Sequence, residues 1–220
     1  MKTMHPPMAD KAGGGVVQVH TEQMKILRER TGAGYLACKN ALLEAGGDLE
    51  EALRLLRAKG AAIAAEKADR AARQGLVGCY AHGGRIGVLV EVNCETDSVA
   101  RTDQFKAFVQ ELCLQIASMN PRYVSREEVP PEVVGEALAQ LHEEIQGVED
   151  EAAPSMQQAH MEQFYRELVL LDQVYIRDST KTIQDLLHEV VLSLRENIVI
   201  RRFVRFSLGE NLPLPPAPSV

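Results

Sequence analysis

Apolar side chains in the first part of the chain recur every three or four residues, the spacing of amphipathic helices. Thr21 is the expected N-cap of a first helix, and Gly46-Gly47 should end a second one. Asp48 with Glu51 three residues later predicts a capping box at the start of a third. The apolar positions of the three helices are Met24, Ile26 and Leu27, then Leu36, Leu42 and Leu43, then Leu49, Leu53, Leu55 and Leu56. A bundle this small has a thin core, which favours a docking module over a catalytic scaffold.

Further along the chain the spacing changes to every second residue, which indicates strands. Two alternating runs flank His82-Gly83-Gly84 and predict a β-hairpin with a glycine-rich turn. Their residues are Leu76, Val77, Gly78, Cys79 and Tyr80, then Ile86, Val88, Leu89, Val90, Glu91 and Val92. A third strand is expected near the C-terminus, with Ile198, Ile200, Val204, Phe206 and Leu208 on one face together with Arg202. The three strands predict an antiparallel sheet.

Helical patterns fill the segment between the hairpin and the last strand. Thr102 should cap one helix, and Ser125 with Glu128 predicts a capping box for another. The apolar stripes are Phe105, Val109, Leu112 and Ile116, then Met161, Phe164, Tyr165, Leu168 and Leu171, then Ile183, Leu186, Leu187, Val190 and Leu194. The resulting fold class is α+β, with three N-terminal helices followed by a core domain in which helices pack on a three-stranded antiparallel sheet.

The expected division of the chain has five parts. They are a flexible leader over residues 1–17, a three-helix docking module over 18–58, a helical linker over 59–73, the α+β core domain over 74–210 and a proline-rich tail over 211–220. Glycines and prolines mark the leader and the tail, and an alanine-rich charged run favours helix in the linker.

Composition narrows the classes of function. The 220 residues carry a formal charge of -7, which argues against direct binding of nucleic acid. The four cysteines are widely spaced and predict reduced thiols rather than a metal or redox site. With neither an apolar run long enough for a membrane span nor a secretory signal, we expect a cytoplasmic protein or an organellar counterpart. Catalytic residues, metal ligands and cofactors are not expected.

Two segments could carry function. Residues 92–101 lie where a strand ends and a helix begins, so they could present Asp97 to a partner, or Thr96 and Asp97 could simply cap the helix. Cys94 beside Glu95 could also be a reactive thiol, although residues 94–100 contain no basic side chain that would lower its pKa. Residues 201–206 interleave arginine with phenylalanine, which suggests either single-stranded nucleic acid or a strand whose arginines pair with acidic helices.

Four collinear motifs lie within about residues 19 to 210, and they occupy residues 27–42, 91–97, 119–125 and 196–203. In these motifs the chain resembles the elongation factor Ts family. The length is similar to that of the short members, which have one core subdomain. The resemblance implies a factor that binds elongation factor Tu and accelerates GDP release. It also implies a ubiquitin-associated-like helical module that docks on the GTPase, and a loop that disturbs the Mg²⁺ and switch region.

Carried over by position, the resemblance places Arg28, Tyr35, Leu36 and Lys39 on the docking surface and Thr96, Asp97, Ser98 and Val99 in the intruding loop. Two departures stand out. Tyr35-Leu36 replaces a pair of methionines, and Ser98 replaces a phenylalanine. Truncation of a phenylalanine that is buried in a partner's pocket costs about 3–5 kcal/mol of binding free energy. A serine at the same position supplies almost none of that energy.

The resemblance further implies that a homodimer can form through the sheet. In some relatives a disulfide near the last strand joins the two copies, but Val204 stands at that position here, so this disulfide is excluded. Two alternative functions remain. One is a protein-binding module unrelated to nucleotide exchange, and the other is an enzyme built on Cys94, Glu95 and Asp97.

Overall fold

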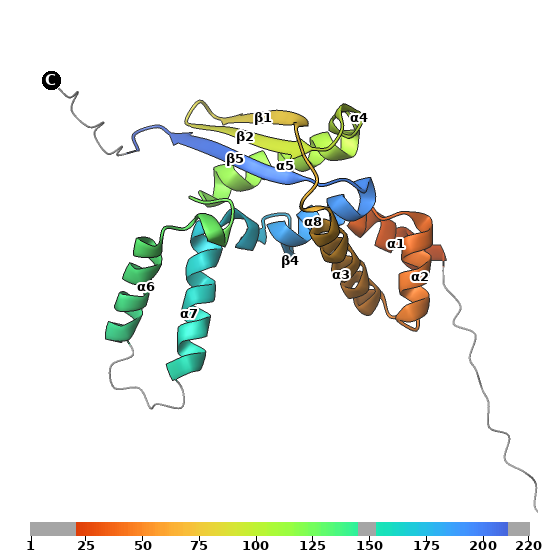
Figure 1. The fold of residues 1–220 in the computed structure, drawn as a ribbon, viewed down its shortest axis with the longest axis horizontal. Coiled ribbons are helices and arrows are strands. Elements are labelled where there is room, and N and C mark those ends of the chain that lie inside the picture. The colour runs from red at the N-terminus through yellow and green to blue at the C-terminus, as the bar shows by residue number, and fades with distance from the viewer. Residues whose placement is uncertain (1–20, 145–152, 211–220) are drawn as a thin grey trace, which may run out of the picture.

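A computed structural model describes residues 21–144 and 153–210 (Figure 1). The helices are α1 (Thr21–Thr31), α2 (Tyr35–Glu44), α3 (Leu49–Lys67), α4 (Asp97–Ala100), α5 (Asp103–Met119), α6 (Pro131–Glu144), α7 (Ala153–Leu168) and α8 (Ile183–Leu194), with short 3-10 turns η1 (Arg126–Glu128) and η2 (Leu170–Asp172). The strands are β1 (Gln74–His82), β2 (Ile86–Cys94), β3 (Val174–Tyr175), β4 (Asp178–Thr182) and β5 (Val199–Ser207). The predicted α+β class is confirmed, while the leader and the tail lie outside the described residues.

The three N-terminal helices enclose their own small core. It consists of Met24, Leu27, Ala33, Cys38, Ala41, Leu42, Ala52, Leu53 and Leu56, with Leu192 of α8 packed against them. The Asp48 side chain caps α3 by accepting a hydrogen bond from the backbone N–H of Glu51 at 2.9 Å. The Glu51 carboxylate accepts a hydrogen bond from Arg54 instead of closing the predicted capping box. Because α8 completes this core, the unit is anchored on the rest of the protein rather than suspended from it.

Helix α3 runs without a break across residue 58, where the sequence predicted the docking module to end. Its second half packs on α8, and Gly60 allows a close approach. A Cβ atom at Gly60 would lie 2.5 Å from the carbonyl oxygen of His188. The residues predicted as a helical linker therefore begin as the end of a helix shared by both regions, and the division into domains stays a prediction.

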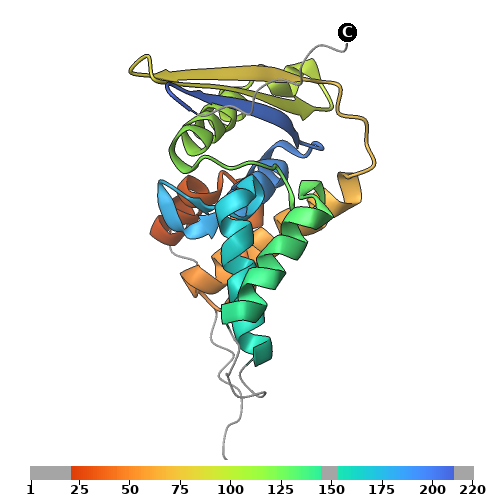
Figure 2. The same ribbon diagram turned by 90° about the vertical axis from the view of Figure 1, so that its left-hand side faces the viewer.

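The three-stranded sheet is antiparallel in the order β1-β2-β5 and forms one layer, with the helices beneath it (Figure 2). Gly83 and Gly84 form the turn between β1 and β2 with positive φ angles of 54° and 66°, conformations that glycine adopts without strain. Helices α5 and α8 pack below and bury Val88, Val90, Val92, Phe105, Val109, Leu112, Ile116, Val190, Val191, Ile198 and Ile200. The predicted hairpin and sheet are confirmed.

The predicted face of the last strand is wrong beyond Ile200. Val92 pairs with Ile200 but Glu91 pairs with Arg202, so β5 holds one extra residue, a β-bulge. The bulge reverses the alternation of side chains, because a shift of one residue turns each to the other face. Ile200 points into the core, whereas Val204 and Phe206 are 40% and 62% exposed on the opposite face of the sheet.

Two details of the helical region also differ from the sequence prediction. The Ser125 side chain forms no cap, and residues 126–128 form only a 3-10 turn before α6 begins at Pro131. The Glu128 carboxylate instead accepts a hydrogen bond from the backbone N–H of Val124 at 2.9 Å. A small hairpin of β3 and β4 precedes α8, and the sequence pattern did not indicate it.

Candidate partner-binding site

The segment of residues 96–99 starts where the buried strand β2 ends at Cys94. Thr96 is the N-cap of α4, and its hydroxyl oxygen accepts a hydrogen bond from the backbone N–H of Val99 at 3.3 Å. Thr96, Asp97 and Ser98 are exposed, while Val99 is half-buried against the core. The capping interpretation is therefore right for Thr96, and the same turn also presents three polar side chains to solvent. The predicted loop is in fact the first turn of a helix.

The Asp97 carboxylate forms an ion pair with the guanidinium of Arg101 at 2.7 Å, one helical turn further on. Both side chains are more than half exposed. An exposed pair of this kind stabilises a fold by at most about 1 kcal/mol. Asp97 is consequently free to exchange this contact for one with a partner.

Glu196 anchors the segment from the connection between α8 and β5, and the sequence analysis gave it no role in the site. One oxygen of its carboxylate accepts hydrogen bonds from the backbone N–H groups of Glu95 and Thr96, both at 3.0 Å. The other oxygen accepts a hydrogen bond from the Thr96 hydroxyl at 2.6 Å. The only sequence signal for this role was the place of Glu196 in the motif at 196–203. Glu196 and Thr96 are 100 residues apart in the sequence, and periodic patterns reveal only contacts between residues that are close in sequence.

The Cys94 thiol lies beneath this turn and is fully buried. It donates a hydrogen bond to the Thr96 carbonyl oxygen at 3.2 Å. Burial raises the pKa of Cys94, and the negative charge of Glu196 raises it further. A nucleophilic cysteine requires the opposite, an accessible thiol with a lowered pKa.

The second candidate surface lies where α1 and α2 meet. Tyr35 and Leu36, in the first turn of α2, are 61% and 67% exposed although both are large and apolar. Arg28 and Tyr35 line one shallow hollow of about 530 Å³ together with Thr21, Met24, Lys25, Glu29, Gly32 and Ala33. Leu36 and Lys39 are exposed on α2 beside it. All four predicted docking residues are thus accessible.

A hydrogen bond from α8 holds the turn between α1 and α2 in place beside this surface. The Ser193 hydroxyl of α8 donates to the Gly32 carbonyl oxygen at 2.9 Å and also lies 2.9 Å from the side-chain oxygen of Gln104. Gly32 has a φ of 62°, and a Cβ atom there would lie 2.8 Å from the Gln104 side chain. In Figure 1 the α1–α2 surface and α4 lie toward the same end of the long axis. One protein partner could contact both.

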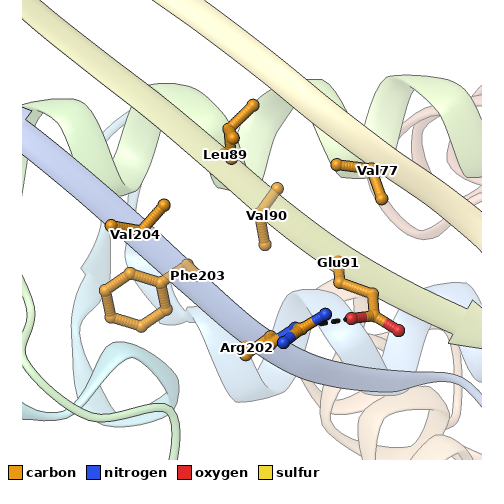
Figure 3. A pocket seen from close by; sticks show the side chains of 7 residues that line it. All are labelled: Val77, Leu89, Val90, Glu91, Arg202, Phe203 and Val204. Atoms are coloured by element: carbon orange, nitrogen blue, oxygen red, sulfur yellow. Dashed lines mark hydrogen bonds and ion pairs between the residues drawn. The ribbon is translucent and has the colours of Figure 1, made fainter.

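The outer face of the sheet forms a third exposed surface (Figure 3). It holds a hollow of about 260 Å³ bordered by Val77, Leu89, Glu91, Arg202 and Val204, and also by Val90 and Phe203, which pack against the core below the sheet. Arg202 pairs with Glu91 across the strands at 2.8 Å, so this arginine does not pair with an acidic helix as one interpretation predicted. Solvent-exposed apolar side chains on the face of a sheet are typical of a protein–protein interaction surface.

Searches for other kinds of site were confined to residues 21–144 and 153–210. Within them, histidine, cysteine and acidic side chains do not form any group of three or more that could hold a metal ion. Over the same residues, helices long and apolar enough to cross a membrane are absent.

The structure is an α+β fold whose candidate partner-binding residues lie on exposed surfaces. Comparison with known proteins gives the family. Residues 16–210 match the family model described as Elongation factor TS. The chain belongs to the elongation factor Ts family and is therefore a translation elongation factor.

Curated relatives agree with this assignment. Elongation factor Ts of Thermoanaerobacter sp. (strain X514) is 53% identical over 197 residues, which cover 88% of this chain and 97% of the relative. Elongation factor Ts of Caldanaerobacter subterraneus subsp. tengcongensis is 52% identical over 197 residues, covering 88% and 98%. That of Moorella thermoacetica is 47% identical over 192 residues, covering 86% and 95%. The resemblance seen in the sequence motifs is confirmed.

Proposed function

We propose that this protein is a guanine-nucleotide exchange factor for elongation factor Tu. Membership of the elongation factor Ts family supports the proposal, and the observation that carries it is the exposed helix start at residues 96–99. Three polar or acidic side chains are exposed on this turn, and hydrogen bonds to the Glu196 carboxylate hold its backbone in place. A rigid acidic turn is suited to entering a partner's surface without first having to become ordered.

The proposed mechanism is negative coupling between two ligands of the GTPase. Tyr35 and Leu36 supply apolar area for docking, and Asp97 then approaches the Mg²⁺ and switch region. Mg²⁺ requires near-ideal octahedral geometry, so a small displacement of its ligands weakens the binding of metal and GDP together. By reciprocity, the Mg²⁺–GDP pair weakens binding of this protein by the same factor. No covalent step is involved, and we propose that the protein is not an enzyme and acts in the cytoplasm.

A direct test uses elongation factor Tu loaded with fluorescent GDP. Release is followed by stopped-flow fluorescence with excess unlabelled GDP, with and without this protein. The proposal predicts a release rate that rises with the concentration of this protein and then saturates. A rate that stays at its intrinsic value would leave the alternative of a protein-binding module unrelated to nucleotide exchange.

We further propose that a second copy of this chain covers the outer face of the sheet. The support is the run of exposed apolar side chains on that face, among them Val77, Leu89 and Phe206. Cys79 is exposed on the same strand as Val77, whereas the other three cysteines are buried. Sedimentation should show a concentration-dependent dimer in which Cys79 reacts with thiol reagents more slowly than in the monomer. Equal labelling rates in both states would place the interface elsewhere.

A further inference from the structure

The anchor of residues 96–99 belongs to a larger hydrogen-bond network, formed between segments far apart in the sequence. Glu196 accepts the three hydrogen bonds from Glu95 and Thr96 described above. In return, the Glu95 carboxylate accepts a hydrogen bond from the backbone N–H of Asn197 at 2.7 Å. The end of β2 and the connection between α8 and β5 are therefore joined in both directions, each by a carboxylate that accepts backbone N–H groups of the other.

The same network reaches the C-terminal end of α3. The Asn197 side chain is 7% exposed, and its amide nitrogen donates to the carbonyl oxygens of Ala68 at 3.2 Å and Arg70 at 2.8 Å. The guanidinium of Arg70 also lies 3.6 Å from the Glu95 carboxylate. Helix α3 begins in the three-helix unit and packs against α1 and α2, which carry the docking surface, so the network links that unit with the turn that carries Asp97.

The strength of this link comes from its charge. A hydrogen bond between an ionised carboxylate and an N–H or O–H group is about twice as strong as one between neutral groups. Removal of Glu196 would leave two backbone N–H groups and one hydroxyl without their acceptor. The exposed turn would keep other supports, among them the Thr96 cap, the hydrogen bond from the Cys94 thiol to the Thr96 carbonyl oxygen and the contact of Val99 with the core. Those contacts keep the turn folded but fix its direction less tightly.

We propose that Glu196 and Asn197 are positioning residues for nucleotide exchange. This inference rests on the proposed function. Glu196 acts through Thr96 and holds the exposed turn in one orientation, and Asn197 holds that turn at a fixed place relative to α3. Docking of the three-helix unit on a GTPase then brings Asp97 to its target without a search among orientations.

The test compares Glu196→Ala with a matched control, Glu128→Ala. Glu128 is likewise a carboxylate that accepts a backbone N–H, but it does so beside α6, away from the network. The rate of GDP release from elongation factor Tu is measured against the concentration of each variant. Glu196→Ala should lower the plateau rate about tenfold or more, while the half-saturating concentration changes less than about threefold. Glu128→Ala should leave both values near those of the unaltered protein.

Hydrogen exchange of the free protein gives a second readout that needs no GTPase. In Glu196→Ala the backbone amides of Glu95 and Thr96 should exchange about tenfold faster or more, while amides in β2 remain protected. If this variant does not fold, Glu196→Gln and Thr96→Val carry the same two measurements. Each should lower the plateau, and their combination should lower it by less than the product of the single effects, because both weaken the hydrogen bond between Thr96 and Glu196.

The outcomes separate this inference from the proposed function. Absence of acceleration by the unaltered protein would overturn the proposed function, and hydrogen exchange would still report on the anchoring role of Glu196. Acceleration by the unaltered protein with an unchanged plateau in Glu196→Ala would overturn the positioning role. Unchanged exchange of the Thr96 amide, or a change only in the half-saturating concentration, would also overturn it.

Discussion

The two surfaces proposed to meet elongation factor Tu are built in opposite ways. The α1–α2 surface exposes large apolar side chains, Tyr35 and Leu36, on helices packed around a small hydrophobic core. The turn at residues 96–99 exposes small polar and acidic side chains and is held by a carboxylate. Exposed apolar area favours affinity, whereas a charged anchor favours accurate placement. The difference suggests that the first surface supplies binding and the second supplies exchange.

The largest effect should come from removing the apolar pair. Tyr35→Ala combined with Leu36→Ala should raise the half-saturating concentration about 100-fold, because central apolar side chains dominate the energy of an interface. The plateau rate should change little. Leu43→Ala is the matched control, since Leu43 is 43% exposed on the same helix but lies outside the predicted docking residues. A concentration series of GDP release measures both quantities. A lower plateau in the double variant would contradict the proposal that the α1–α2 surface supplies only binding.

The next effect concerns the acidic side chain of the turn. Asp97→Ala should lower the plateau rate of GDP release about tenfold and weaken binding by less, because the carboxylate is proposed to act only beside the metal. Arg101→Ala serves as the control. It removes the exposed ion pair but leaves the carboxylate in place, so the plateau should stay within about twofold. Equal losses of binding and of plateau rate in Asp97→Ala would mean that Asp97 is only an anchor.

A smaller gain is expected at Ser98, where the resemblance implies a phenylalanine. Ser98 is exposed, so Ser98→Phe can be accommodated without disturbing the core. The added aromatic ring should raise the plateau rate severalfold with a typical elongation factor Tu, because it supplies apolar contact that serine lacks. Ser98→Ala should leave release unchanged. Slower release with Ser98→Phe would show that the partner of this protein has no pocket for the ring.

The smallest effect concerns the junction between the two regions, where His188 lies beside Gly60 of α3. Burial lowers the pKa of His188 below its usual value, against a smaller opposite influence of Asp185. As the pH falls below about 6.5, the unfolded chain binds a proton that the folded protein excludes, so the free energy of unfolding decreases.

Urea unfolding at pH 7.5 and 5.5 measures this loss, which should be below about 1 kcal/mol and smaller in His188→Gln. The neighbouring ion pair of Lys181 and Glu189, at 2.6 Å, is present in both proteins, so their difference isolates the histidine. His142→Gln, at an exposed histidine, should behave like the unaltered protein. An identical pH dependence in all three proteins would exclude a half-buried neutral imidazole at the junction.

Local patterns predicted most of the fold. The three helices, the hairpin and the caps at Asp48 and Thr102 depend on residues close together in sequence, and the structure contains them all. The face of β5 was wrong because a bulge depends on the register with β2, which a single strand does not reveal. The β3–β4 hairpin was missed because β3 has only two residues, too few for a period to emerge.

The candidate site was predictable only in part, for the same physical reason. Thr96 and Asp97 follow directly from their place between a strand and a helix, and Tyr35 and Leu36 follow from the family resemblance. Glu196 and Asn197 gain their suggested role from contacts that span roughly 100 or more residues of chain. Their side chains are ordinary in composition, and only the folded structure shows what they hold.

The central claim is that the α1–α2 surface supplies binding and the turn at residues 96–99 supplies exchange. Its most direct test is one titration of GDP release from elongation factor Tu, carried out with the unaltered protein, the Tyr35/Leu36 double variant and Asp97→Ala. The unaltered protein should accelerate release to a plateau. The double variant should reach nearly the same plateau at about 100-fold higher concentration, and Asp97→Ala should reach a plateau about tenfold lower at a similar concentration. No acceleration by the unaltered protein, or parallel changes of plateau and half-saturating concentration in both variants, would contradict it.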